Sequence, residues 1–452
     1  MKAAILGGGG VRTPLLIHGL VHAAGLRGLS EVMLFDADEA RTEMIAALGR
    51  EIVQRAGASV RIGVSTDLAA VAEGAGVVFN SIRVGGITAR AADEQVAMAH
   101  GLAGQETTGP GGVAMALRTI PVTLMHAATV ERVAPRAWFL NFTNPAGLIT
   151  QALLEHSGVR AVGICDTPIE LFHRIAGALG AQVQEMEFDY AGLNHLGWVR
   201  QVRLRGEDVT KRLLRDETRL RAVYPDTTFD PELMQALGLI PSEYLFFYYR
   251  QRRALANQMR AGASRGGEIA QLNVELFQQL GRVDSAHGLD IYKNYLRRRN
   301  ASYMKLETEA GSVFGDSGHT EDPFETATGY HRVAVAVLEA LESDEDRTVV
   351  ANVANRGAVM DLEAEDVVEV PCAISRRGVV AKPVGRLPES VRGLVLAVKA
   401  YERATIRAAV EKSGRLAELA MLEYPLIGQW DLARELLQAL VQRDPEHLGY
   451  LA

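Results

Sequence analysis

A run of four glycines near the start of the chain separates two segments of opposite character. Residues 2–6 form a short apolar run, which is typical of a buried strand. Residues 15–21, in contrast, place apolar side chains at helical spacing. Pro14 suits the first position of a helix, and the Thr13 hydroxyl is placed to cap it. Gly7–Gly10 must therefore turn the chain sharply from a strand into a helix N-terminus.

Such a turn is either a bare connection or a cradle for the pyrophosphate of a dinucleotide. The match to G-x-G-x-x-G is imperfect, because Thr13 stands where the third glycine would be. Asp36 ends a second apolar run at the spacing expected for a carboxylate that binds ribose hydroxyls, although it could instead cap the next helix. A third predicted strand at 76–80 continues the strand–helix order, so we predict a Rossmann-type domain that binds a nucleotide. The predicted cofactor contacts are Gly8, Gly10, Val11, Thr13, Asp36 and Asn80.

Charge and composition exclude several classes of partner. The net charge of -7 argues against broad electrostatic binding to nucleic acid or to an anionic membrane. No apolar run approaches the length of a membrane span, and no signal pattern precedes the first predicted strand. Two cysteines are too few for a disulfide framework. We therefore expect a cytoplasmic protein with a small-molecule ligand.

The middle of the chain carries polar residues where predicted strands end. Asn144 follows one such strand, and Cys165 follows another at the start of a predicted helix, where a thiol pKa tends to be lowered. A lone cysteine or histidine is more often a packing residue, but Cys165 with His195 would suit a divalent transition metal. The glycine-rich loop 104–112 is either a mobile cover over a ligand or, as we favour, a solvated surface loop.

Taken in order, the motifs resemble glycoside hydrolase family 4, an NAD-dependent exception among glycosidases. They are IRVGG, GQETTGPGG, ALRTIPV, NFTNPAG, GICDTP, GLNHLGW and PSEYLFFYY, and the resemblance covers nearly the whole chain. The C-terminal runs VKAYERATIRAAV and AMLEYPLIGQWDLARELL resemble the 6-phospho-β-glucosidase branch most. The resemblance implies a homo-oligomer, dimer or tetramer, with no nucleic-acid or membrane partner.

The resemblance also implies a reaction and a set of residue roles. Members of the family oxidise the sugar at C3 with NAD, remove the C2 proton, eliminate the aglycone and add water. A divalent metal, usually Mn²⁺, would be bound by Cys165 and His195, and Tyr244 would be the base, with Arg265 as an active-site arginine. A tyrosine needs a nearby cation to act as a base at neutral pH. Without the resemblance, Tyr244 would be a core aromatic. The substrate-binding candidates are Arg83, Arg90, Asn144 and Asn194.

Two departures from the 6-phospho-β-glucosidase branch leave the substrate open. Asp166 stands where many members have asparagine, and in the 6-phospho-α-glucosidase branch an aspartate there protonates the leaving oxygen. Residues 297–307 replace a common glycine-rich RGGS stretch. The alternatives are therefore a 6-phospho-α-glucosidase, a hydrolase of non-phosphorylated glycosides, or, from another class, a lactate- or malate-type dehydrogenase.

The expected fold class is α/β. We predict a Rossmann-type NAD-binding domain over residues 1–165, followed by an α+β substrate and metal domain over 166–452. The apolar stretches 349–362 and 367–374 are predicted strands of the second domain, and Cys372 is predicted to serve packing.

Overall fold

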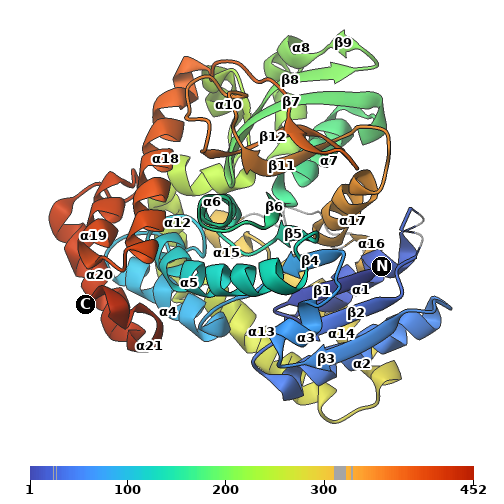
Figure 1. Cartoon of the computed structure of the whole chain (residues 1–452). Helices are drawn as coiled ribbons and strands as arrows, with labels where there is room; N and C mark the ends of the chain where they lie inside the picture. The colour runs from blue at the N-terminus through green and yellow to red at the C-terminus, as the bar shows by residue number, and fades with distance from the viewer. Residues whose placement is uncertain (24, 27, 310–321, 327–328) are drawn as a thin grey trace.

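The computed structural model describes residues 1–23, 25–26, 28–309, 322–326 and 329–452. Its strands form one 13-stranded sheet, around which the helices are arranged (Figure 1). The order along the sheet is β10-β8-β7-β12-β11-β6-β5-β4-β1-β2-β3, with β13 beside β12 and β9 beside β8.

One half of the sheet is parallel and corresponds to the predicted Rossmann-type domain. In it β1 lies between β2 and β4, with Leu6 opposite both Phe35 and Asn80. All predicted strands of this half are present, because short apolar runs buried on both faces suit a parallel sheet. The strands are β1 (Lys2–Leu6), β2 (Glu31–Phe35), β3 (Arg61–Ser65), β4 (Val77–Asn80), β5 (Trp138–Asn141) and β6 (Arg160–Gly163).

The other half of the sheet is antiparallel. It joins the parallel half where Asn352 of β11 pairs with Gly163 of β6. The predicted strand at 367–374 is confirmed as β12. Of the predicted stretch 349–362, only the residues up to Ala354 lie in a strand, β11, and both strands extend the first sheet. The strands are β7 (Met186–Leu193), β8 (Leu196–Leu204), β9 (Glu207–Asp208), β10 (Ile240–Pro241), β11 (Arg347–Ala354), β12 (Val367–Ser375) and β13 (Gly378–Ala381).

The helices of the N-terminal half lie on both sides of the parallel strands (Figure 1). They are α1 (Thr13–His22), α2 (Glu39–Arg55), α3 (Leu68–Ala72), α4 (Gly86–Ala99), α5 (Pro110–Val133), α6 (Ala146–His156) and α7 (Thr167–Leu179). The structure corrects the predicted cap of the first of these. Helix α1 begins at Thr13 itself, and Arg12 occupies the N-cap position without a side-chain cap.

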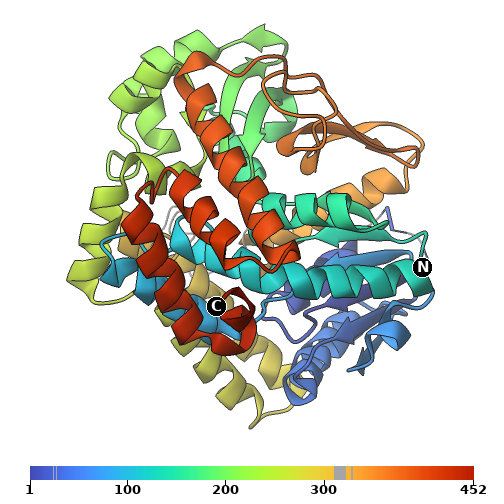
Figure 2. The same cartoon turned by 60° about the vertical axis from the view of Figure 1, so that its left-hand side comes forward.

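The remaining helices cover the antiparallel strands and return to the N-terminal half. Helix α18 packs against α5, so the two predicted domains share packing as well as a sheet (Figure 2). The predicted boundary after residue 165 lies between β6 and α7 and stays a prediction. The helices are α8 (Thr210–Arg215), α9 (Glu217–Val223), α10 (Pro231–Leu237), α11 (Phe246–Tyr249), α12 (Gln251–Ala261), α13 (Arg265–Leu280), α14 (Ser285–Ala301), α15 (Lys305–Thr308), α16 (Pro323–Thr326), α17 (Tyr330–Leu341), α18 (Glu389–Val410), α19 (Gly414–Glu423), α20 (Trp430–Arg443) and α21 (Pro445–Leu448), with single 3₁₀ turns at Val183–Glu185, Glu243–Leu245 and Gly449–Leu451.

Helix α5 corrects the expectation that no segment reaches the length of a membrane span. By length and composition this one helix among the described residues could cross a membrane. However, 67% of its apolar window is buried within the protein, as for the core helix of a folded domain.

Candidate active site

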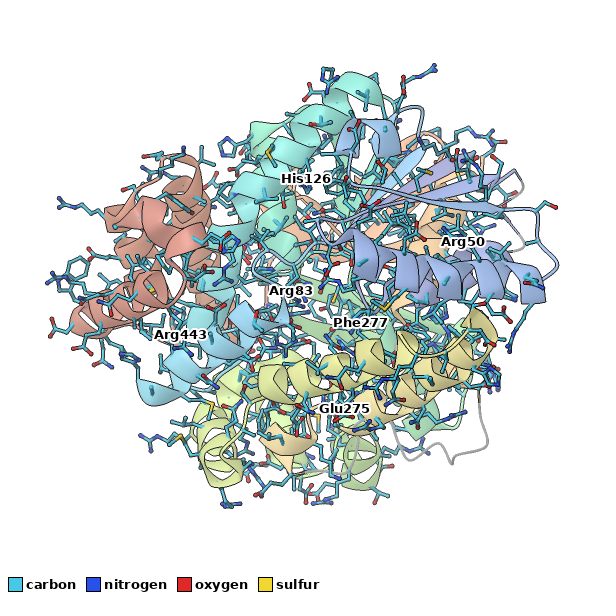
Figure 3. All side chains as sticks on the ribbon, turned by 90° about the horizontal axis from the view of Figure 1, so that it is seen from below. Arg50, Arg83, His126, Glu275, Phe277 and Arg443 are labelled. Atoms are coloured by element: carbon cyan, nitrogen blue, oxygen red, sulfur yellow. The ribbon has the colours of Figure 1, made fainter. Side chains whose placement is uncertain are left out.

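A cavity of about 630 Å³ runs along the carboxyl ends of the parallel strands. One end is lined by Gly10 and Asp36, and the other by Cys165, His195 and Tyr244. Ligands of open α/β sheets bind at this edge. Seen from below, Arg83 and Phe277 of α13, which both line the cavity, are labelled near one another (Figure 3).

The glycine turn brings the backbone to the cavity wall. Gly7 has φ +84°, and its N–H donates to the Phe35 carbonyl at 2.9 Å. A Cβ on Gly10 would lie 2.9 Å from the Gly7 carbonyl oxygen, so a side chain there requires the turn to shift. Gly10 and Val11 line the cavity, whereas Gly8 packs behind the turn, where a Cβ would lie 2.6 Å from Cβ of Leu34.

The Asp36 carboxylate faces the cavity beside this turn. It accepts hydrogen bonds from the Gly9 N–H at 3.0 Å and from Nη2 of Arg41 at 3.2 Å. The alternative that Asp36 caps the next helix is wrong, because Asp38 caps α2 by accepting from the Arg41 N–H at 3.0 Å. Asp36 lines the cavity, and its role in binding ribose stays a prediction.

Besides Gly8, two further predicted cofactor contacts lie outside the described lining of the cavity. Thr13 is buried within the first turn of α1. Asn80 is fully buried, and its Nδ2 donates to Oδ1 of Asn141 at 3.0 Å. Asn80 joins the ends of β4 and β5 beneath the cavity, whereas Thr13 packs within α1, so any effect of either residue on a cofactor would be indirect.

Cys165 and His195 meet at the other end of the cavity, as the metal hypothesis requires. The Cys165 Sγ lies 3.4 Å from Nε2 of His195, and both residues are buried. The Thr107 hydroxyl hydrogen-bonds Nδ1 of His195 at 2.8 Å. This contact fixes the ring and leaves Nε2 beside the sulfur, which is how histidine ligands are commonly held.

Burial sets the protonation of this pair in the protein alone. It lowers the pKa of His195 to about 4, so the imidazole is neutral, as a metal ligand must be. Burial, with the nearby Glu369 and Asp166 carboxylates, raises the pKa of the Cys165 thiol well above its usual range. The expectation that the helix N-terminus favours a thiolate is therefore wrong for the chain alone; a bound cation is needed.

The two residues fit a divalent metal as a partial ligand set. No cluster of three or more His, Cys, Asp or Glu side chains is placed to hold an ion within the described ranges. One sulfur and one nitrogen ligand would leave several coordination positions for water or substrate oxygens.

Tyr244 lies directly against this pair. Its ring stacks on that of His195, with centroids 3.6 Å apart and planes 3° apart, and it lines the cavity. Burial raises the pKa of the Tyr244 hydroxyl, and the Glu106 and Glu243 carboxylates raise it further. Tyr303 donates a hydrogen bond to this hydroxyl, at 3.3 Å. A cation in the cavity must therefore offset burial before Tyr244 can act as a base.

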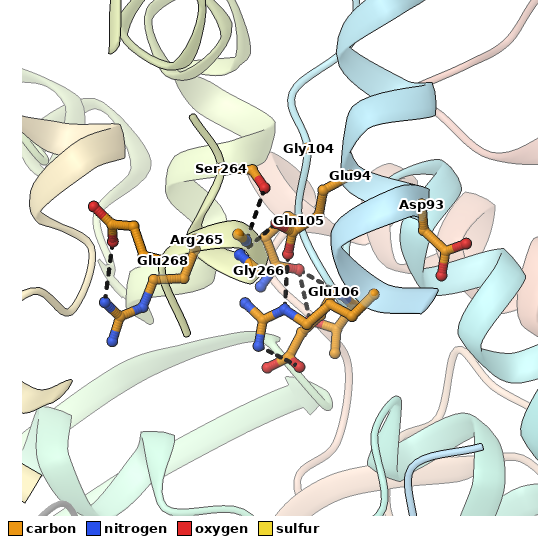
Figure 4. Close-up of polar contacts among 12 residues, drawn as sticks. Asp93, Glu94, Gly104, Gln105, Glu106, Ser264, Arg265, Gly266 and Glu268 are labelled. Carbon is orange, nitrogen blue, oxygen red and sulfur yellow. Dashed lines mark hydrogen bonds and ion pairs between the residues drawn. The ribbon is translucent and has the colours of Figure 1, made fainter. Parts of the chain in front are cut away.

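The predicted substrate arginines are already occupied by a carboxylate. Glu106 accepts from Nη2 of Arg83 and Nη1 of Arg90, each at 2.7 Å, and this pairing holds the pKa of Glu106 well below its usual range. Nε of Arg90 also donates to Glu94, at 2.8 Å. Figure 4 shows Glu106 and Glu94 in this network. The arginines line the cavity with little unmatched charge.

The remaining candidates divide between the cavity and its supports. Asn144 and Asp166 line the cavity, and Asp166 forms an ion pair with Arg12 at 3.6 Å. Asn194 is outside the described lining: its Oδ1 accepts from the Ala146 N–H at 3.1 Å and its Nδ2 donates to Glu369 at 3.1 Å. It positions the loop that carries His195.

Arg265 begins α13 and lines a smaller adjoining cavity that Tyr244 also lines. Its guanidinium bonds to Glu268 (Figure 4). It also bonds to the Ser302 hydroxyl and, at 2.8 Å, to the backbone carbonyl of Arg299. In this arrangement it is a neighbour of the site.

The loop 104–112 corrects a further expectation. We favoured a solvated surface loop, but Gln105, Thr107 and Thr108 are buried. Oε1 of Gln105 accepts hydrogen bonds from the N–H groups of Thr107 and Thr108, so the side chain replaces solvent as their partner. The loop thereby supplies Glu106 and Thr107 to the site, and its motif GQETTGPGG was the sequence signal that could have identified them.

Comparison with known families accounts for this arrangement. A model described as "Family 4 glycosyl hydrolase" matches residues 2–181, and one described as "Family 4 glycosyl hydrolase C-terminal domain" matches residues 190–427. The chain belongs to glycosyl hydrolase family 4. Within this family it is 30% identical over 463 residues to the probable 6-phospho-beta-glucosidase of Bacillus subtilis (strain 168), covering 100% of this chain and 97% of the other.

Other members of family 4 resemble the chain over its whole length. The 6-phospho-alpha-glucosidase 1 of Lacticaseibacillus paracasei is 27% identical, over 98% of this chain and 97% of its own. The 6-phospho-beta glucosidase of Thermotoga maritima, whose structure holds manganese, NAD⁺ and glucose-6-phosphate, superimposes with a TM-score of 0.82 at 27% identity, over 99% of both chains. The family predicted from the motifs is confirmed.

Proposed function

We propose that this chain hydrolyses 6-phospho-β-glucosides by NAD-dependent oxidation at C3, removal of the C2 proton, elimination of the aglycone and addition of water. The observation that carries the proposal is the single cavity that joins the glycine turn and Asp36 to Cys165, His195 and Tyr244. A cofactor that spans this cavity would bring its reactive end to the residues that hold a metal and move a proton.

The proposed roles of the residues follow from their places in the cavity. When bound, NAD⁺ would supply a hydride acceptor, and a divalent cation such as Mn²⁺ would supply a Lewis acid. Cys165 and His195 would hold the cation, while the glycine turn at Gly10, which leads into the N-terminus of α1, would admit the pyrophosphate.

Tyr244 is the proposed acceptor of the C2 proton. Its stacking on His195 and its contact with the Tyr303 hydroxyl restrict the position of its oxygen. Asp166 lines the same cavity and is the proposed donor of a proton to the departing oxygen. Because this residue is also the departure from the β branch, a 6-phospho-α-glucosidase is the second candidate function.

Arg299 supports a phosphorylated substrate. Like Tyr244 it lines both cavities, and its Nη1 donates to the hydroxyl of Tyr295 at 2.9 Å. In contrast, Arg83 and Arg90 are matched by the Glu106 carboxylate. The Arg299 guanidinium is therefore the better candidate to meet a phosphate.

Release of p-nitrophenol tests this function. The substrates are p-nitrophenyl α- and β-glucosides with and without a 6-phosphate, each assayed with NAD⁺ and Mn²⁺ and after chelation. We expect turnover of the 6-phospho-β-glucoside that needs both additions, and a raised KM in Arg299→Gln for phosphorylated substrates alone. Preference for the α-anomer would select the second candidate, and net accumulation of NADH without p-nitrophenol would contradict both.

The proposal extends to the assembly, the domains and the cellular compartment. We expect a cytoplasmic homo-oligomer, dimer or tetramer, without a nucleic-acid or membrane partner, in which residues 1–165 bind the cofactor and residues 166–452 hold most of the substrate. Both cysteines are buried and free, which suits a reducing compartment. Sedimentation of the purified chain tests the oligomeric state, and cell fractionation tests the compartment.

A further inference from the structure

His126 lines the cavity at the end that the metal ligands do not occupy. It lies on α5, one helical turn after Val122, and both side chains line the cavity. The imidazole is set edge-on to the Phe35 ring, with centroids 5.3 Å apart and planes at 90°. Since Phe35 immediately precedes Asp36, this histidine belongs to the end where the dinucleotide's adenosine is proposed to lie. Figure 3 labels it on α5.

The hydrogen bonding of His126 is incomplete in the protein alone. The side chain is about 95% buried, with a relative exposure of 5%, yet its Nδ1 is enclosed with no hydrogen-bond partner among the described residues. Burial lowers the pKa of the imidazole to about 4, so at neutral pH the ring is uncharged and carries one donor and one acceptor.

The enclosed position of Nδ1 indicates where the ring proton resides. An orphaned N–H in an apolar surrounding is rarer than an under-satisfied acceptor. The favoured tautomer therefore leaves Nδ1 bare and places the proton on Nε2. This gives a neutral donor on a ring whose plane Phe35 restricts.

We propose that His126 is a specificity-determining residue of the cofactor site, which donates a hydrogen bond from Nε2 to a ring nitrogen of adenine. This proposal rests on the proposed NAD site. With the pyrophosphate at the glycine turn and the ribose at Asp36, the base is the next group outward, and Phe35, Val122 and His126 line the cavity there. Phe35 and Val122 offer apolar contact, so His126 supplies the polar recognition of the base.

Calorimetric titration of the full chain with NAD⁺ tests the proposal. We expect His126→Leu to raise the Kd for NAD⁺ about 10-fold, the scale of one neutral hydrogen bond in a site that excludes water. His126→Gln should restore most of the affinity, because its Nε2 can place a donor where the imidazole Nε2 stood. Met125→Leu is the matched control, since Met125 is 59% exposed on the same turn and lies outside the described lining.

A second ligand separates loss of the base contact from a general loss of structure. Nicotinamide mononucleotide lacks the adenosine, so its affinity should be the same in His126→Leu and the parent. Equal affinity of parent and His126→Leu for NAD⁺ would overturn the role of His126 while leaving the proposed function standing. A parent chain that binds no NAD⁺ would overturn both.

Discussion

The two ends of the cavity are built in different ways. At the cofactor end, Gly10 and Asp36 lie within 30 residues of one another and follow the adjacent parallel strands β1 and β2, and the Gly9 backbone bonds directly to Asp36. At the reaction end, the loop residue Thr107, Cys165 after β6, His195 between β7 and β8, and Tyr244 come from four distant segments. One end is a local product of strand–turn–helix geometry, and the other exists only when the whole chain has folded.

Because the two ends are built differently, substitutions at each end should impair different properties of the enzyme. Changes at the cofactor end should weaken NAD⁺ binding and leave the chemistry of the saturated enzyme nearly intact. Changes at the reaction end should lower kcat or metal affinity and leave NAD⁺ binding nearly intact. The predictions below test that separation, beginning with the largest expected effect.

Removing the proposed base should have the largest effect. Tyr244→Phe keeps the ring that stacks on His195 but loses the hydroxyl, so kcat should fall by roughly 10²- to 10⁴-fold. The Kd for NAD⁺ from calorimetry should change less than about 2-fold, because Tyr244 lies at the opposite end of the cavity from Gly10 and Asp36. Tyr248→Phe is the control, because that hydroxyl bonds to Tyr424 at 3.0 Å. Equal kcat in Tyr244→Phe and the parent would refute this assignment.

The metal pair should give the next effect. Cys165→Ser keeps the size of the side chain but loses the sulfur ligand, so Mn²⁺ affinity, measured by electron paramagnetic resonance, should fall by about 100-fold or more. Thr107→Val leaves both ligands but removes the bond to Nδ1 of His195, and should cost roughly 10- to 100-fold in affinity.

Cys372 provides a matched control for the cysteine variant. It is fully buried on β12, where its thiol contacts the Val370 carbonyl, and it lies outside the described lining of the cavity. Cys372→Ser should keep the Mn²⁺ affinity of the parent. If Cys165→Ser also binds Mn²⁺ like the parent, the proposed ligand set is wrong.

At the cofactor end, Gly10→Val should raise the Kd for NAD⁺ by roughly 10- to 100-fold, or about 1.4–2.8 kcal/mol. The new side chain would meet the Gly7 carbonyl oxygen and intrude on the cavity wall. Gly177→Ala on α7 is the control, since a Cβ there meets nothing within 4 Å. A folded Gly10→Val chain with the parent's affinity for NAD⁺ would show that the glycine turn is not part of the NAD⁺ site.

The smallest effect is expected for Asp36→Asn. The amide keeps the shape but loses the charge and one acceptor, so the Kd for NAD⁺ should rise by about 3- to 10-fold. Mn²⁺ affinity should be unchanged, because Asp36 lies at the opposite end of the cavity. A fall in Mn²⁺ affinity instead would show that the two ends are coupled.

The same contrast explains what the sequence could predict. The strands from Lys2 to Phe35 and the glycine turn follow from apolar runs and backbone geometry that depend on neighbouring residues alone. The pairing of Cys165 with His195 was predicted from ordered family motifs, because thirty residues of spacing do not determine a contact.

The errors concern groups whose environment depends on distant segments. The loop around Gln105 is buried since its polar groups bond to one another and to Gln258, a partner no local pattern indicates. Asn194 and Asn80 bond to buried glutamate and asparagine side chains from distant segments, and their predicted ligand contacts stay predictions. Burial of Cys165 reverses the pKa direction expected from its place before a helix.

The central claim is that bond cleavage at C1 requires removal of the proton at C2, and turnover in D₂O tests it most directly. The parent chain should hydrolyse the 6-phospho-β-glucoside with NAD⁺ and Mn²⁺ and release a sugar that carries deuterium at C2 by NMR, because elimination exchanges this hydrogen with solvent. Tyr244→Phe should suppress hydrolysis and exchange together. A product formed at the normal rate with its C2 hydrogen fully retained would contradict the account, since direct displacement at C1 leaves that hydrogen in place.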